Sequence, residues 1–366
     1  MGRADPLDAD ALARLRLIRT SSVGPVTYRH LLARFGTAQA AIDAIPDLAR
    51  RGGGRLPRIP SLADIVREAE RVAALGGFYL LAGRDDYPEL LAEADDAPPA
   101  LIAAGNAALP ARPCVALVGA RNASAAAVRF ARQLAFDLAA LDYVVVSGLA
   151  RGIDTAAHQG ALEGGTIGVV AGGLDIFYPP ENEALQRTMA TRGLVLSEQP
   201  PGTEPHARHF PSRNRIIAGL SQGTVVVEAA PRSGSLITAR LAADYGREVM
   251  AVPGSPLDPR AQGCNLLIRE GATLIQSAAD IAEAVQPFGQ GRVAAPVASY
   301  SAESPATDVE ARDREKLLAL LSPSPVAIDE LVRQSGLSPS ILQTLLLELE
   351  LGGRLVRHAG ARVSLH

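Results

Sequence analysis

The stretch Cys114–Gly119, which reads Cys-Val-Ala-Leu-Val-Gly, is a continuous apolar run that ends in glycine. Ser124 follows as a candidate N-cap, and an alanine-rich segment extends from it to Leu141. A serine at this position accepts a hydrogen bond from a free amide of the first helical turn, so we expect a helix there. An apolar strand, a glycine turn and a helix predict the start of an α/β fold, because strands buried on both faces are apolar throughout.

The same alternation continues along the chain. Apolar strands are expected at residues 143–147, 166–171, 194–197, 224–228 and 248–252, and helices at residues 155–162, 181–191, 214–220 and 236–245. This order predicts a Rossmann-like, doubly wound and mainly parallel sheet. Ligands of such sheets bind beyond the carboxyl ends of the strands. We therefore expect the ligand site on the loops at residues 119–124, 147–154, 172–180, 198–215, 228–235 and 253–265.

The composition indicates a globular protein whose positive charge is clustered locally. The chain has 366 residues, of which 48% are hydrophobic, and a formal net charge of −3. No apolar run reaches the roughly 18 residues of a membrane span, and the N-terminus lacks the apolar segment of a signal peptide. Cys114 and Cys264 are the only cysteines, which argues against a disulfide framework or a zinc site. We expect a cytoplasmic protein without membrane insertion, metal or other cofactor.

The segment His206–Arg215, His-Ala-Arg-His-Phe-Pro-Ser-Arg-Asn-Arg, has the clearest functional pattern. It places three arginines and two histidines around Phe210, and no acidic residue occurs over residues 205–227. Guanidinium groups bind phosphate oxygens bidentately, and an aromatic ring stacks on a base. We interpret the segment as a loop at the edge of the core that binds single-stranded nucleic acid. The alternative is structural, with Phe210 in the core and with Arg213 and Arg215 in ion pairs.

Motifs of several enzyme classes are absent from the sequence. A Gly-x-x-x-x-Gly-Lys-Ser/Thr phosphate loop is excluded because Lys316 is the only lysine, and no Gly-x-Gly-x-x-Gly follows the first strand. Asp154 and His158 have the spacing of a metal or acid–base pair, but the favoured interpretation of Asp154 is a helix N-cap. The serine-glycine-serine segment at residues 233–235 opens a helix, where free backbone amides attract anions, and we interpret it as a phosphate cradle.

Two small modules flank the sheet. Residues 12–48 have a helical pattern with breaks at residues 21–25 and 35–37, which indicates a sterile-alpha-motif or helix-hairpin-helix type of domain. The last 57 residues resemble a winged helix, with helices expected at residues 312–321, 328–335 and 339–351, and then a hairpin over residues 354–365. Winged helices often read DNA with the third helix, but this one carries Glu348 and Glu350 and no basic residue. A packing or protein-binding role is therefore expected for it.

The expected organisation has four parts. They are a helical domain at residues 1–75, a Rossmann-like DNA-binding domain at residues 76–287, a linker rich in Ala, Pro, Ser and Gly at residues 288–309, and a winged-helix-like domain at residues 310–366.

An ordered series of motifs carries a family resemblance. It includes Val-Gly-Ala-Arg at residues 118–121, Ser-Gly-Leu-Ala-Arg-Gly-Ile-Asp at 147–154, Tyr-Pro at 178–179, Phe-Pro-Ser-Arg-Asn-Arg at 210–215, Ser-Gly-Ser-Leu-Ile-Thr-Ala at 233–239 and Gly-Cys-Asn at 263–265. The series spans roughly residues 80–285 and resembles the DNA-processing protein A family, also called DprA or Smf.

The resemblance implies a homodimeric protein without catalytic activity that binds single-stranded DNA of any sequence and protects it during natural transformation and recombination. It also implies that the protein helps to load the RecA recombinase onto the strand, displacing single-strand-binding protein. Arg121 matches an arginine with which the family binds DNA, and His209 and Phe210 match its basic and aromatic segment.

The expected DNA site combines these matches with the polar residues of the loops. We expect either Arg213 or Arg215 to face DNA and the other to hold the loop by a salt bridge to Glu198 or Glu228. The expected site residues are Gly119, Arg121, Ser124, Gly148, Arg151, Arg208, His209, Phe210, Arg213, Asn214, Arg215, Ser233, Gly234 and Ser235.

Two other functions are alternatives. The first is a nucleotide-binding or nucleoside-monophosphate-hydrolysing enzyme, since phosphoribohydrolases have a distantly similar fold; their Pro-Gly-Gly-x-Gly-Thr-x-x-Glu signature does not occur in this chain. The second is an adaptor whose central fold binds protein and whose basic segment serves structure.

Overall fold

The computed structural model describes residues 7–285, 311–358 and 360–366. These residues form two compact units: a larger unit of residues 68–285, and a smaller unit of residues 7–67 together with 311–366. Helix α4 (Leu62–Ala74) begins in the smaller unit and ends in the larger one, close to the boundary expected between residues 75 and 76. The linker expected at residues 288–309 lies outside the described residues.

The larger unit is built on a nine-stranded sheet with the order β1-β2-β6-β5-β4-β3-β7-β8-β9. The strands are β1 (Phe78–Leu81), β2 (Ala100–Gly105), β3 (Cys114–Val118), β4 (Val144–Ser147), β5 (Thr166–Val170), β6 (Leu194–Ser197), β7 (Gly223–Val226), β8 (Glu248–Ala251) and β9 (Thr273–Leu274). Strands β3 to β9 are parallel, whereas β1 and β2 add an antiparallel edge beside β6. The predicted doubly wound, mainly parallel sheet is confirmed.

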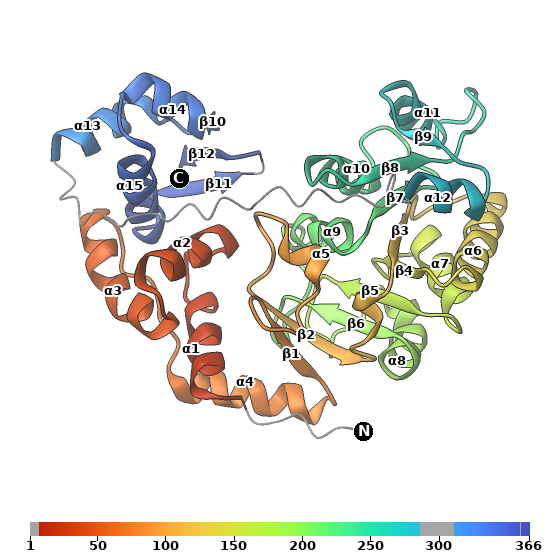
Figure 1. Ribbon diagram of the computed structural model, residues 1–366, viewed down its shortest axis with the longest axis horizontal. Helices are drawn as coiled ribbons and strands as arrows, with labels where there is room; N and C mark the ends of the chain where they lie inside the picture. The colour runs from red at the N-terminus through yellow and green to blue at the C-terminus, as the bar shows by residue number, and fades with distance from the viewer. Residues whose placement is uncertain (1–6, 286–310, 359) are drawn as a thin grey trace. The chain divides into compact units, whose positions relative to one another are not determined.

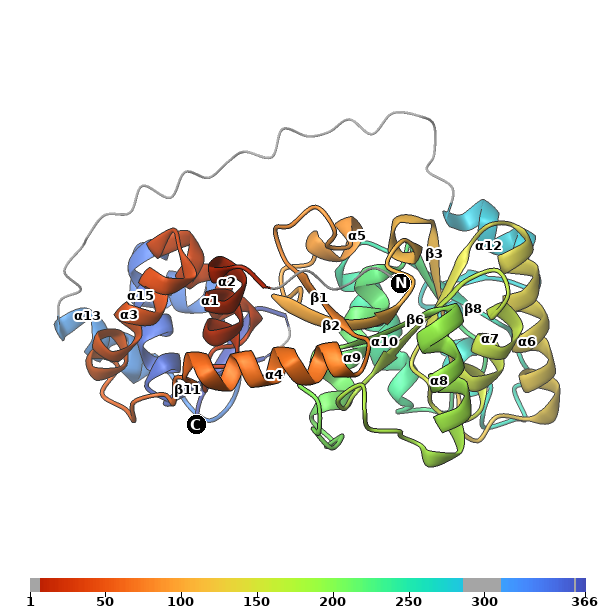
Figure 2. The ribbon, with the colours of Figure 1, turned by 90° about the horizontal axis from the view of Figure 1, so that it is seen from below.

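Helices cover both faces of this sheet (Figure 1; Figure 2). One face carries α5 (Glu89–Ala92), α9 (His209–Leu220), α10 (Gly234–Asp244) and α11 (Gln262–Arg269), and the other carries α6 (Ala125–Ala140), α7 (Ile153–Ala161), α8 (Glu183–Arg192) and α12 (Ala278–Val285). Single 3₁₀ turns lie at Leu109–Ala111 and Pro180–Asn182.

Strand β3 shows why its sequence is apolar throughout. Its side chains alternate between the two faces of the sheet. Ala116 and Val118 belong to the core under α9 and α10, whereas Val115 and Leu117 belong to the core under α6 and α7. Both faces are buried, so no position of the strand is available for a polar residue.

The order of the strands places a crevice beside β3. This strand pairs with β4 on one side and with β7 on the other, because the chain first winds through β4, β5 and β6 and then returns across the sheet. At such a switch point the loops that follow the two central strands diverge, which opens a site at the carboxyl edge.

The smaller unit contains one segment from the N-terminal part of the chain and one from the C-terminal part. It contains the helices α1 (Ala9–Ile18), α2 (Pro25–Phe35), α3 (Ala38–Arg51), α13 (Ala311–Leu320), α14 (Ile328–Ser335) and α15 (Pro339–Leu351), and a sheet of β10 (Val326–Ala327), β12 (Arg362–Leu365) and β11 (Leu355–His358). The helical breaks expected near residues 21–25 and 35–37 are confirmed, as are the three helices and the hairpin of the winged helix. No helix among the described residues is long and apolar enough to cross a membrane.

Helix α15 packs against α3. Its residues Leu347 and Leu351 share a core with Leu17 and Ile45 of the N-terminal helices. Gly52 comes so close to α15 that a Cβ atom there would lie 1.9 Å from the carbonyl oxygen of Glu348. The helix that reads DNA in many winged helices is thus used here for packing.

The acidic residues of α15 are paired inside the smaller unit. Glu348 is 1% exposed and forms an ion pair with Arg314. Glu350 forms an ion pair with Arg357 at 2.8 Å. Buried charges are tolerated when they are paired, so both acids have a structural role.

The shared core predicts that a mutation in the winged helix loosens the N-terminal helices. Leu351→Ala removes a fully buried side chain, which costs about 2–5 kcal/mol of unfolding free energy. Amide hydrogen exchange of α1 and α3 should accelerate. The matched control is Leu331→Ala, because Leu331 is equally buried but belongs to the core of the winged helix alone. Faster exchange in α13 and α14 only, for both variants, would contradict the shared core.

Candidate nucleic-acid interface

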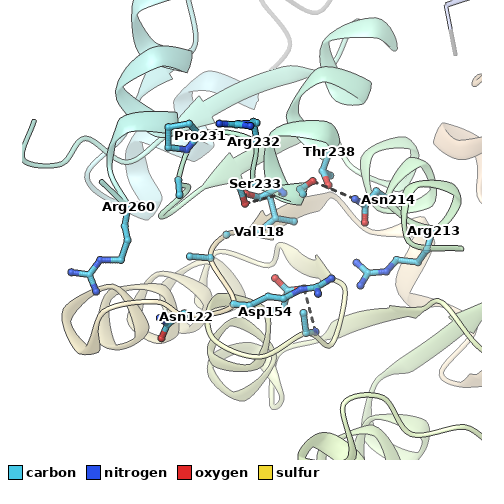
Figure 3. Close-up of a pocket in the computed structure, with 17 residues that line it drawn as sticks. Val118, Asn122, Asp154, Arg213, Asn214, Pro231, Arg232, Ser233, Thr238 and Arg260 are labelled. Carbon is cyan, nitrogen blue, oxygen red and sulfur yellow. Dashed lines mark hydrogen bonds between the residues drawn. The ribbon is translucent and has the colours of Figure 1, made fainter. Parts of the chain in front are cut away.

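A cleft of about 550 Å³ lies at the switch point (Figure 3). Its walls come from the loop after β3 and from the loop that leads into α10, and Asp154 of α7 and Arg213 of α9 complete it. This is the edge at which the sequence analysis places the ligand site. The cleft is lined by Val118, Gly119, Ala120, Arg121, Asn122, Ala150, Asp154, Arg213, Asn214, Ala230, Pro231, Arg232, Ser233, Gly234, Ser235, Thr238 and Arg260.

Two glycines allow the segments around the cleft to approach one another. A Cβ atom on Gly148 would lie 1.7 Å from Nη1 of Arg213. A Cβ atom on Gly119 would lie 2.6 Å from the side chain of Ile153. A side chain at position 148 would therefore displace the guanidinium of Arg213, and a side chain at position 119 would collide with Ile153 at the start of α7.

Arg213 is the most buried cation of the cleft. It is 7% exposed, its Nη2 donates a hydrogen bond of 2.9 Å to the carbonyl oxygen of Gly148, and its guanidinium is directed toward Asp154 (Figure 3). Burial lowers the pKa of Arg213 to about 10, Asp154 opposes this shift, and the like charge of Arg121 adds to it. The group remains a cation at neutral pH.

Asp154 is not the N-cap that the sequence analysis favours. Gly152 is the N-cap of α7, and Asp154 lies within the first turn. Its carboxylate accepts hydrogen bonds from the amides of Gly148 at 3.2 Å and Ala150 at 3.3 Å, so it orders the loop after β4. Burial raises the pKa of Asp154, and the positive charge of Arg213 is the largest effect that opposes this shift.

His158 is a buried structural residue. Its Nδ1 lies 2.7 Å from the hydroxyl of Thr166, and burial, together with the charge of Arg213, lowers the pKa of His158 to about 3. Within residues 7–285, 311–358 and 360–366, no group of three or more His, Cys, Asp or Glu side chains could hold a metal ion.

Most of the basic segment is helical, so its interpretation as a loop is wrong from residue 209 onward, and only residues 206–208 precede the helix. Helix α9 begins at His209, not near residue 214 as expected. Pro211 is compatible with this start, because proline is tolerated in the first turn of a helix. As a result His209, Arg213 and Arg215 are buried against the sheet.

Arg215 has the structural role that the sequence analysis leaves open between it and Arg213. It forms an ion pair of 2.6 Å with Glu198, in which the side chains are 9% and 16% exposed. It also donates a hydrogen bond to the carbonyl oxygen of Asp96. The expected salt bridge to Glu198 is confirmed, and Arg215 is not among the residues that line the cleft.

The other expected residues divide into two groups. Ser124 caps α6, as predicted, and its hydroxyl donates to Glu228 at 2.7 Å. Arg151 is exposed and forms an ion pair with Glu181. The cleft brings together Gly119, Arg121, Arg213, Asn214, Ser233, Gly234 and Ser235; it does not include Ser124, Gly148, Arg151, Arg208, His209, Phe210 or Arg215.

An aromatic pair lies beside the cleft. Cζ of Arg121 is 5.2 Å from the ring centroid of Phe210, and that ring is 5.7 Å from the ring of Tyr178 at an interplanar angle of 60°. Phe210 is partly exposed and Tyr178 is 50% exposed, so Phe210 does not have the expected alternative role in the core. Arg121 both lines the cleft and contacts this pair.

Three residues of this region are not predicted as site residues from the sequence: Tyr178, Arg232 and Arg260. The last two are further arginines of the cleft, and Arg260 is held by Asp258 at 2.8 Å. Tyr178 lies in a loop that the sequence analysis assigns to the ligand edge. Its position after a parallel strand, together with its aromatic ring, is the signal that could have identified it.

These features define a Rossmann-like protein with an arginine-lined cleft, accompanied by a helical and a winged-helix module. The family described as DNA recombination-mediator protein A matches residues 78–286. The DprA-like N-terminal HHH domain matches residues 8–70, and the DprA winged helix domain matches residues 301–361. The chain belongs to the DNA recombination-mediator protein A family, whose members are also named DprA or Smf. The expected family is confirmed.

Relatives and solved structures extend this agreement. DNA processing protein DprA of Streptococcus pneumoniae is 49% identical over 199 residues, 54% of this chain and 70% of that protein. Protein Smf of Synechocystis is 35% identical over 317 residues, 78% of this chain and 79% of that protein.

The X-ray structure of the Streptococcus pneumoniae protein has a TM-score of 0.58 and 44% identity, and the match covers 61% of this chain and 78% of that one. DNA processing protein A of Helicobacter pylori, whose structure is described for its single-stranded DNA binding mode, has a TM-score of 0.51 and 30% identity, and the match covers 56% of this chain and 94% of that one.

The buried ion pair of Arg215 predicts a large stability effect. Arg215→Met removes the buried ion pair with Glu198 and the hydrogen bond to Asp96, so the free energy of unfolding should fall by about 3–5 kcal/mol. Urea denaturation measures this change. The control is Arg192→Ala, since Arg192 and Glu163 form an exposed ion pair worth about 0–1 kcal/mol. Equal, small losses in both variants would show that Arg215 is not a structural anchor.

Proposed function

We propose that the larger unit binds single-stranded DNA without sequence preference. The observation that carries the proposal is the position of Arg121, which lines the cleft and lies over the ring of Phe210. A single strand presents phosphates and bases side by side. Arg121 lies between the cleft, where a phosphate can bind, and the ring of Phe210, on which the neighbouring base can stack.

The phosphate side of the site is strongly basic. The cleft lining includes Arg121, Arg213, Arg232 and Arg260 against the single carboxylate of Asp154. Helix α10 starts at Gly234 on the same wall, and the free amides and positive dipole of a helix N-terminus attract anions. Guanidinium groups bind phosphate in a bidentate manner. The local charge therefore favours a nucleic-acid backbone although the whole chain is slightly acidic.

The base side of the site is aromatic. Phe210 and the half-exposed Tyr178 offer ring faces on which any base can stack, which explains a lack of sequence preference. In a duplex the base faces are already covered by their neighbours, and extruding a base costs a few kcal/mol. The rings therefore favour a single strand over a duplex.

The proposal has further parts that rest on the family. We infer that the protein protects the strand and helps to load the RecA recombinase during recombination or transformation, with displacement of single-strand-binding protein, and that it has no catalytic activity. The described binding mode of the Helicobacter pylori relative supports the single-strand specificity. A homodimer is also proposed. Leu266 of α11 and Leu274 of the edge strand β9 are 37% and 46% exposed, and they support a contact at that edge.

Arg121→Ala should weaken strand binding and reduce its salt dependence. Each lost phosphate contact reduces the slope of log K against log salt by about 0.7 for a single strand. Fluorescence anisotropy of labelled oligo-dT at several salt concentrations, with the matched duplex for comparison, measures both effects. Arg129→Ala is the charge-matched control, because Arg129 is exposed on α6 and lies outside the cleft lining. An unchanged slope in Arg121→Ala would remove Arg121 from the site.

Failure of the protein to bind any oligonucleotide would favour the alternative function of a protein-binding adaptor. Release of a base from nucleoside monophosphates would favour the alternative function of a nucleoside-monophosphate-hydrolysing enzyme.

Replacement of either ring should weaken binding without changing the salt slope. Phe210→Ala and Tyr178→Ala each remove a stacking face, worth about 1–3 kcal/mol per base, but no charge. The same anisotropy titration applies, and circular dichroism shows whether each variant is folded. Tyr178→Phe keeps the ring and should retain most of the affinity. If Tyr178→Phe is as weak as Tyr178→Ala, the hydroxyl and not the ring makes the contact.

A further inference from the structure

The deepest part of the cleft has an incompletely satisfied cation. Arg213 is 7% exposed, and its Nε is buried without a hydrogen-bond partner among the described residues. Buried polar atoms are nearly always paired, and an exception points to a ligand or water that completes the site. The Nη2 atom of the same guanidinium donates a hydrogen bond of 2.9 Å to the carbonyl oxygen of Gly148.

A helix N-terminus faces the same space. Helix α10 spans Gly234–Asp244, and its N-cap Ser233 and its first residues, Gly234 and Ser235, line the cleft together with Arg213. The surroundings of Gly234 are open, since a Cβ atom built there meets no atom within 4 Å. An anion between α10 and Arg213 would therefore meet the helix dipole and the guanidinium together.

We propose that this cleft binds a phosphate monoester carried by a nucleoside, the chemistry shared by the end of a phosphorylated strand and by a free nucleoside monophosphate. The inference rests on the proposed binding of single-stranded DNA. It identifies the phosphorylated end as the part of the strand that enters the cleft.

The charge of the cleft favours a monoester over an internal diester. The cleft is lined by Arg121, Arg213, Arg232 and Arg260. Asp154 opposes the charge of Arg213 and Asp258 pairs with Arg260, which leaves two of the four positive charges, those of Arg121 and Arg232, to meet a ligand. An internal phosphodiester carries one negative charge, whereas a monoester carries about 1.5 to 2 at neutral pH. The charge of the monoester matches these two cations, whereas an internal diester would match only one of them.

The size of the cleft favours a single nucleotide. A volume of about 550 Å³ is typical of a site for one drug-sized molecule, which is the size of a nucleoside monophosphate. An internal phosphate carries a nucleoside on each side, and a cleft of this size accommodates about one of them. A terminal phosphate brings one nucleoside, and Arg121 leads from the cleft to the ring of Phe210 on which its base can stack.

Competition between strand ends tests the inference. A fluorescent thymidine strand with hydroxyls at both ends is displaced by unlabelled thymidine strands of equal, short length that carry a 5′-phosphate, a 3′-phosphate or neither. A phosphorylated strand should compete about tenfold better, equivalent to about 1.4 kcal/mol. Thymidine monophosphate, added alone and followed by calorimetry, separates the two sources of the monoester.

A variant pair at Gly234 separates the cleft from the general charge of the strand. Replacing Arg213 would leave Asp154 buried without its partner, so Gly234 is the better position. Gly234→Asp places a carboxylate at the open start of α10 and should abolish the preference for a phosphorylated end. Gly234→Asn adds the same bulk without the charge and should lose much less of it.

The outcomes are distinct. Preference for a phosphorylated end that disappears in Gly234→Asp supports the inference for strand ends. Binding of thymidine monophosphate without any preference for strand ends supports it for free nucleotides.

Equal competition by all strands, with no binding of thymidine monophosphate, overturns the inference and leaves strand binding intact. A preference that survives in Gly234→Asp also overturns it. Absence of any strand binding removes the proposed function, and the calorimetric titration then still tests the cleft.

Discussion

The cleft depends on the burial of one guanidinium, that of Arg213, at the edge of the sheet. Arg213 reaches from α9 to the loop after β4, where Gly148 accepts its hydrogen bond and Asp154 balances its charge. A buried charge is costly unless it is paired, so the helix, the loop and the carboxylate must be placed together. Gly148 is part of the same constraint, because any side chain there would occupy the space of the guanidinium. The buried position of Arg213 thus fixes the loop after β4 and the start of α7 beside the cleft.

The parts of the fold that follow from local sequence could be predicted, and those that follow from distant pairing could not. Strand β3 is evident because burial of both faces requires an apolar run. Strand β2 is not evident: its alanines and glycine have low β propensity, and its conformation is fixed by pairing with β6. Helix α9 is misjudged because its arginines and Pro211 suggest a surface loop. Their partners, Asp154 and Glu198, are brought close only by the fold. Tyr178 meets Phe210 for the same reason.

The predominance of arginine suits the way this site is built. Arg121 serves as a cation toward the cleft and as a planar group over Phe210, and a lysine could supply the first contact but not the second. Arg215 uses the same planar fork for Glu198 and for the carbonyl oxygen of Asp96. Lys316 is the only lysine of the chain, so fork-shaped cations carry nearly all of its positive charge. The same residue type thus builds the core of the site and its surface.

The packing of α15 against α3 sets an order of events during synthesis. The N-terminal helices leave the ribosome first, but Leu351, which completes their core, belongs to the last helix of the chain. At about 5–20 residues per second, the apolar face of α3 waits on the order of tens of seconds for its partner. During that interval the larger unit can fold, because its sheet needs no residue beyond α12. An exposed apolar face of this kind is a target for chaperones or for the same face of a neighbouring nascent chain. The smaller unit is thus the last part of the protein to become native, although its first helix is the first to be made.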